Sequence, residues 1–99
     1  MNVKIQSIKF TADKKLIDFI NQKVNKLERL FDNIIDADVY LRADKPQEIT
    51  NKSVEIRLNV PGADLFAHKQ CSSFEEAVDE CVDALKNQVK KHKEKVKGA

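Results

Sequence analysis

Lysine side chains gather near the C-terminus at spacings that suit the binding of phosphate groups. The segment holds six lysines and a single acid, Glu94; the lysines are Lys86, Lys90, Lys91, Lys93, Lys95 and Lys97. In a helix, four of them would form one stripe because they recur at intervals of three or four residues: Lys86, Lys90, Lys93 and Lys97. Cations in such a row bind a nucleic-acid backbone by displacing its condensed counterions.

A purely structural explanation covers part of this charge pattern. The first half of the same segment is acidic and carries Glu75, Glu76, Asp79, Glu80 and Asp83. Acids at the start of a helix and bases at its end complement the helix dipole. The dipole effect fades within one turn, so six lysines exceed what it requires. Both explanations stay open from the sequence alone.

A second group of cations lies earlier in the chain. Lys23, Lys26 and Arg29 follow one another at intervals of three residues and avoid the apolar positions, as on an ordinary solvated helix face. If the two helices pack side by side on one face of a sheet, both basic stripes border one groove that suits a phosphate backbone. The RNA-binding residues predicted for this groove are Lys23, Lys26, Arg29, Lys86, Lys90, Lys91 and Lys93.

Residues that commonly perform catalysis are few and poorly placed. His68 and His92 have no serine or cysteine partner in a recognisable order, and Cys81 falls on an apolar helix face. Cys71 and Cys81 lack metal-site spacing and are expected to be inert thiols. Two glycines are too few for a glycine-rich phosphate loop. We therefore expect no enzyme activity, no cofactor, no metal site and no small-molecule substrate.

Composition points to one compact domain over residues 1–99, with a lysine-rich end at about residues 90–99. The chain has 99 residues, of which 41% are hydrophobic and 34% are charged. Its formal net charge of +2 says little about a partner. The first residues form no apolar signal region and no apolar run exceeds three residues, so we expect a cytoplasmic protein that does not enter membranes.

Hydrophobic periodicity places these residues on two helices and four strands. Alternation predicts a first strand from about Val3, with a bulge or bend near Ser7 where the phase loosens. Helical spacing then predicts an amphipathic helix from about Ala12 to Phe31, with Thr11 as its N-cap. Period-2 segments follow at about residues 37–43, 54–60 and 65–71.

The connections and the last helix have their own signals. Asp44–Asn51 is polar, contains Pro46 and is expected to be a long mobile loop, whereas Pro61-Gly62 predicts a tight turn. Ser73 and Glu76 fit a capping box that opens a second helix running to about Glu94.

The resulting order, β-α-β-β-β-α, predicts an α+β fold. The first two strands should be parallel and the last three should form an antiparallel meander, with both helices on one face of the four-stranded sheet. The uncovered face would then present Lys4, Gln6, Tyr40, Arg42, Arg57, Phe66 and His68. Aromatic rings beside cations can stack on unpaired bases, but acids lie among them, and a simply solvated face is the alternative.

Three stretches resemble the ribosome hibernation promoting factors and ribosome-associated translation inhibitors. Val24–Arg29 is similar to the end of their first helix, residues 61–67 look like their last hairpin, and residues 73–79 followed by Leu85 and Gln88 resemble their second helix. The resemblance implies a sheet with two helices on one face, similar to double-stranded RNA-binding domains.

The resemblance also implies a partner and a mechanism. Members of this family bind the small ribosomal subunit and its ribosomal RNA, occupy the path of messenger and transfer RNA, and so stop translation. Lys23, Lys26, Arg29, Lys91 and Lys93 match basic family positions. The chain resembles a short form, which would need a second factor to pair ribosomes or would simply silence single ones.

Two departures and two alternatives accompany this interpretation. Ala84 and Asn87 stand where many members have basic residues, and Lys86 and Lys90 are expected to supply those phosphate contacts instead. A general double-stranded RNA-binding protein would use the same basic groove. A protein-interaction module would instead use the acidic half of the second helix or a sheet edge.

Overall fold

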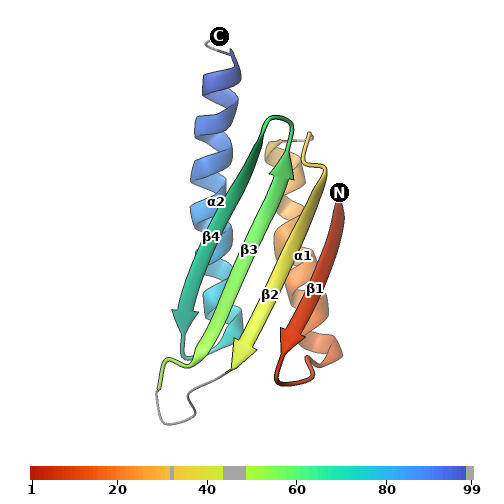
Figure 1. Cartoon of the computed structure of the whole chain (residues 1–99), viewed down its shortest axis with the longest axis vertical. Coiled ribbons are helices and arrows are strands. Elements are labelled where there is room, and N and C mark those ends of the chain that lie inside the picture. Colours follow the sequence, from red (N-terminus) through yellow and green to blue (C-terminus); the bar gives the residue numbers. More distant parts are fainter. Residues whose placement is uncertain (32, 44–48, 98–99) are drawn as a thin grey trace.

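The computed structural model describes residues 1–31, 33–43 and 49–97, with side chains described as far as Lys93. Its elements follow the predicted order, and Figure 1 shows them coloured along the chain. They are β1 (Asn2–Ile8), α1 (Lys14–Leu30), β2 (Asp36–Ala43), β3 (Lys52–Val60), β4 (Ala63–Cys71) and α2 (Phe74–Lys97). Most of the long loop predicted over Asp44–Asn51 lies outside the described residues.

The sheet has the predicted topology. Its strands lie in the order β1-β2-β3-β4, with β1 and β2 parallel because α1 connects them across one face. β2, β3 and β4 form the antiparallel meander. Pro61 and Gly62 make the turn between β3 and β4, and Gly62 adopts a φ of 82°, a conformation that a residue without a Cβ reaches easily.

No bulge interrupts β1, so that part of the expectation is wrong. β1 pairs with β2 continuously from Asn2 opposite Asp36 to Ile8 opposite Arg42. The chain bends only afterwards, at Lys9, whose φ is 68°. Ile8 is therefore an ordinary strand residue on the uncovered face of the sheet, and this explains the loosened hydrophobic phase.

Helix α1 begins two residues later than predicted, and its N-cap is Asp13 rather than Thr11. The Leu16 N–H donates to the Asp13 carboxylate at 2.9 Å, which satisfies one of the unpaired amides of the first turn. Both residues carry an oxygen that can cap a helix, and the path of the chain after Lys9 decides between them. The helix ends at Leu30, where the Phe31 N–H still donates to the Leu27 carbonyl at 3.1 Å.

Helix α2 begins at the predicted cap. The Glu76 N–H donates to Ser73 Oγ at 3.2 Å, as a capping box requires. The Glu76 carboxylate accepts from the Ser72 hydroxyl at 3.3 Å. The helix continues to Lys97 instead of ending near Glu94.

Both helices cover the same face of the sheet and run in the same direction (Figure 1). The core between them is apolar and includes Ile20 and Leu27 of α1, Leu85 of α2 and Ile56 of β3, all at 0% exposure. Burying each such side chain contributes about 1.5–3 kcal/mol. Within the described residues, neither helix has a stretch apolar enough and long enough to span a lipid bilayer.

Candidate nucleic-acid interface

Two polar contacts join α1 and α2. Lys23 Nζ lies 3.0 Å from the Asp79 carboxylate, and Lys93 Nζ donates to the Leu30 carbonyl at 2.7 Å. Near the same end, the rings of Phe31 and His92 meet edge to face, with centroids 5.5 Å apart. The side-by-side packing on which the predicted interface depends is therefore confirmed.

The positions of three more lysines follow from these contacts. Lys86 lies seven residues after Asp79 and seven before Lys93, which is close to two full turns in each direction, so it shares their α1-facing flank. Lys90 follows one turn later, and Lys26 lies one turn beyond Lys23 on α1. We call the set Lys23, Lys26, Lys86, Lys90 and Lys93 the interhelical basic surface.

Two members of this surface also hold the fold together. Lys23 pairs with Asp79, and its ammonium lies 5.5 Å from the centre of the Phe19 ring. Lys93 donates to one of the last carbonyls of α1, where a cation opposes the negative end of the helix dipole. Sequence patterns could not identify either partner, because both contacts join positions that are far apart in the chain.

The other five predicted RNA-binding side chains have no partner of this kind in the described part of the chain. Among the residues whose side chains are described, no hydrogen bond or ion pair involves Lys26, Arg29, Lys86, Lys90 or Lys91. All are exposed except Lys86, which is partly buried. The acidic half of α2 meets Lys23 near its start, so unpaired cations gather toward the C-terminal ends of the two parallel helices.

Arg29 and Lys91 do not lie on the shared flank. Arg29 lies a further three residues around α1 from Lys26, and both border a shallow hollow with Gln22, Asn25 and Glu28, so Lys26 lies between the flank and its margin. Lys91 lies one turn after Gln88, whose side chain faces β4, and so it is on the opposite flank of α2. The structure thus brings together five of the seven predicted residues and places these two at the margins.

Comparison with known proteins gives the family. A family model described as Sigma 54 modulation protein / S30EA ribosomal protein matches residues 3–97. The chain belongs to this family.

One curated relative and two solved structures are similar to this chain. The chain is 32% identical over 95 residues to a Ribosome hibernation promoting factor from Pseudomonas putida, covering 96% of this chain and 89% of that one. It is similar to the N-terminal domain of Thermus thermophilus Protein Y, with a TM-score of 0.79 and 25% identity, covering 93% of this chain and 99% of that one. A ribosomal subunit interface protein from Coxiella burnetii shares the fold, with a TM-score of 0.84 and 18% identity over 94% of this chain and 98% of that one.

Gln88, one of the residues that carried the resemblance to ribosome hibernation promoting factors, protects a sheet edge. Its Nε2 donates to the Phe66 carbonyl at 2.7 Å, and its Oε1 accepts from the Phe66 N–H at 3.3 Å. The amide thus occupies the place of a neighbouring strand along β4, an edge strand of the sheet. Sequence periodicity did not reveal this role, because Gln88 lies at the margin of the apolar stripe.

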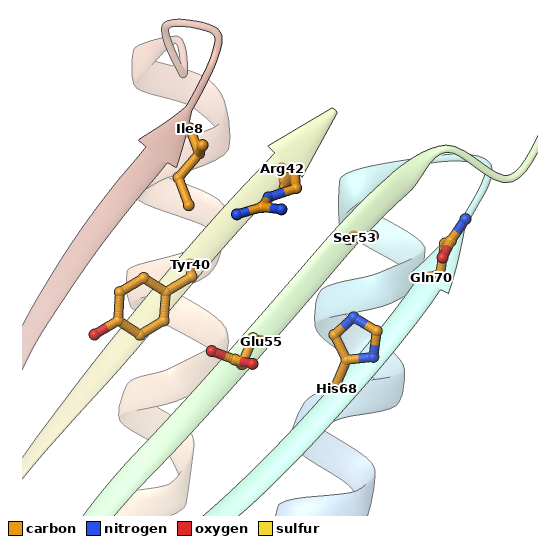
Figure 2. Close-up of a pocket in the computed structure, with 7 residues that line it drawn as sticks. All are labelled: Ile8, Tyr40, Arg42, Ser53, Glu55, His68 and Gln70. Atoms are coloured by element: carbon orange, nitrogen blue, oxygen red, sulfur yellow. The ribbon is translucent and has the colours of Figure 1, made fainter. Parts of the chain in front are cut away.

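Strand register brings three of the residues predicted on the uncovered face, Tyr40, Arg42 and His68, around one hollow. Tyr40 lies opposite Glu55, which lies opposite His68, and Arg42 lies opposite Ser53 in the adjacent row. These residues border a hollow together with Ile8 and Gln70 (Figure 2). Glu55 is one of the acids that the sequence placed on this face, whereas Ser53 and Gln70 were missed, although strand parity could have placed them there.

Arg57, also predicted on the uncovered face, is paired within the chain. Its Nη2 donates to the Asp38 carboxylate of β2 at 2.9 Å. This hydrogen bond raises the pKa of the guanidinium above its usual value.

The cysteines are buried thiols. Burial raises the pKa of Cys81 to about 12, and burial with a nearby Glu80 carboxylate raises that of Cys71 to about 11. Cys71 Sγ donates to Glu80 at 2.5 Å, and donor atoms of Cys71, Glu76 and Glu80 lie within 4.8 Å of one another. This is the one grouping of three or more such residues in the described chain with metal-ligand chemistry, and a metal bound there would have to displace the Cys71 proton.

Proposed function

We propose that this chain binds ribosomal RNA of the small subunit in the path of messenger and transfer RNA and thereby holds idle ribosomes inactive in the cytoplasm. In this proposal residues 1–99 act as one ribosome-binding domain without chemistry of their own. Support comes from membership of the S30EA family and from the Pseudomonas putida relative, whose name is Ribosome hibernation promoting factor. The observation that carries the proposal is the parallel packing of α1 and α2, which gathers cations at one end of the molecule.

The mechanism is steric and electrostatic. Lys26, Lys86 and Lys90 bind backbone phosphates, because their ammonium groups have no partner among the described side chains. Arg29 and Lys91 add contacts at the two margins. Lys23 and Lys93 chiefly hold the helices in register, so that the spacing of the cations is fixed before RNA binds. A rigid domain held in this way blocks messenger and transfer RNA by occupying their volume.

Co-sedimentation with purified small subunits tests the proposal. Reversing charge at Lys26, Lys86 and Lys90 together should abolish binding at moderate salt and leave the circular dichroism spectrum and melting temperature near those of the parent chain. The matched control reverses Lys14, Lys15 and Lys69, which are exposed cations away from this surface. The control has the same net charge and should retain most of the binding. Equal loss in both variants would show that total charge, rather than this surface, governs binding.

Competition separates the main alternative. A domain that fits the messenger and transfer RNA path should be displaced from small subunits only weakly by plain double-stranded RNA. Displacement by duplex RNA as strong as by added small subunits would instead identify a general double-stranded RNA-binding protein. Co-sedimentation that survives high salt and nuclease would identify a protein partner.

A further inference from the structure

The uncovered face of the sheet carries a polar hollow that the proposed function does not use. It has a volume of about 390 Å³, within the range of small-ligand sites, and is open to solvent. Figure 2 shows the side chains of Tyr40, Glu55 and His68 on three adjacent strands around it. Ser53, a small residue on β3, lies between Arg42 and Gln70, so the floor of the hollow is at Ser53 and longer side chains form its walls.

The strand register brings complementary chemical groups together. Tyr40, Glu55 and His68 form one cross-strand row, and directly opposed residues in such a row have Cβ atoms about 4.5–5.5 Å apart. Arg42 lies in the next row, two residues after Tyr40 on the same strand. Among the described side chains, none forms a hydrogen bond or ion pair with Tyr40, Glu55 or His68. A flat ring, a carboxylate, an imidazole and a guanidinium thus border one open space.

We propose that this hollow binds an unpaired guanine base of a single RNA strand. The Tyr40 ring supplies a stacking surface, which serves any base. The Glu55 carboxylate selects guanine, because its two oxygens can accept from the ring N–H and the amino group that lie side by side on the pairing edge of that base. Adenine and cytosine offer only an amino group there, and uracil only a ring N–H.

A neighbouring aromatic residue favours a strand over a free nucleotide. Phe66 is 50% exposed and lies two residues before His68 on the same face of β4. Its ring offers a second stacking surface just outside the hollow, where the next base of a strand would lie. Because α1 and α2 cover the other face, this site is separate from the interhelical basic surface and does not depend on it.

The composition of the chain provides a specific assay. Tyr40 is the only tyrosine and there is no tryptophan, so tyrosine fluorescence reports on this position alone. Titration with the single-stranded RNA pentamer UUGUU should quench this fluorescence saturably, whereas UUAUU should do so at least about tenfold more weakly. Guanosine monophosphate provides the third titration. Quenching by it as tight as by UUGUU would overturn the strand assignment and identify a free nucleotide site.

Variants separate the roles of the residues, with binding followed by the anisotropy of labelled pentamers. Glu55→Gln should reduce the affinity for UUGUU about tenfold and leave that for UUAUU unchanged. Asp64→Asn removes an exposed carboxylate elsewhere on the same face and should change neither. Tyr40→Ala should weaken binding of both pentamers about tenfold, and Tyr40→Phe should retain it.

Absence of quenching at millimolar UUGUU, or equal affinities for the two pentamers in the parent chain, would overturn the proposal. Charge reversal at Lys26, Lys86 and Lys90 should leave pentamer quenching intact, so failure of either site is recognised separately.

Discussion

Replacing Asp79 by asparagine should make the chain bind small subunits more tightly while making it slightly less stable. Asp79 pairs with Lys23 at 3.0 Å, and the two side chains are 50% and 31% exposed. Because water screens such a pair, its loss should cost only about 0.2–1 kcal/mol of unfolding free energy in urea titrations. The released Lys23 ammonium then becomes available for one more phosphate contact on the interhelical basic surface.

The size of the gain follows from counterion release. One added phosphate contact steepens the slope of log affinity against log salt by about 0.7–0.9, which amounts to roughly a fivefold tighter complex at about 0.15 M salt. The assay is co-sedimentation with small subunits at several salt concentrations. Asp83→Asn is the matched control, since it removes an equal charge one turn later from a residue without a partner among the described side chains. The control should leave the slope unchanged. An unchanged slope for Asp79→Asn, combined with the loss of stability, would show that Lys23 serves the fold alone.

Three further outcomes are expected. Lys93→Met should lower the free energy of unfolding in urea by about 0.3–1 kcal/mol, because it removes the cation at the end of α1. Lys90→Met should cost nothing measurable, and equal stabilities of these two variants would contradict the capping role of Lys93. Gln88→Leu should remove two hydrogen bonds to the Phe66 backbone and lower the free energy of unfolding by about 1–2 kcal/mol. The exposed edge of β4 should then increase self-association in sedimentation velocity, and a monomer of parental stability would argue against edge protection. Cys71 and Cys81 should resist thiol reagents at pH 8 until the chain unfolds, and rapid labelling of the folded chain would contradict their burial. The free energy of unfolding should fall as the pH rises from about 9 toward 11, because thiols of the unfolded chain ionise near 9.0 while those of the folded chain keep their protons.

The element order could be predicted because each element follows its own hydrophobic period. The stripe Ile20, Val24 and Leu27 marks α1, and Val54, Ile56 and Leu58 mark β3, with every one of these side chains fully buried. The capping box at Ser73 is equally local, since its partners lie three residues apart. The cap of α1 was predicted wrongly because Thr11 and Asp13 both qualify chemically, and only the path of the chain chooses Asp13.

The candidate site was predictable in composition but not in detail. Charge counts and spacing identify the lysines. Because each strand is apolar on one face only, both helices must cover the same face of the sheet and lie together. Lys91 illustrates what spacing misses, since only the contact of Gln88 with Phe66 shows which flank of α2 faces β4. The pairing of Lys23 with Asp79 likewise depends on how the helices align, which no local pattern encodes.

The salt dependence of ribosome binding in single-lysine variants tests the interhelical basic surface most directly. Neutralising Lys26, Lys86 or Lys90 one at a time to methionine should each reduce the slope of log affinity against log salt by about 0.7–0.9, because each removes one phosphate contact. Neutralising Lys14 or Lys69 should leave it unchanged. Equal slopes across all five variants would contradict the assignment of RNA binding to the shared end of α1 and α2.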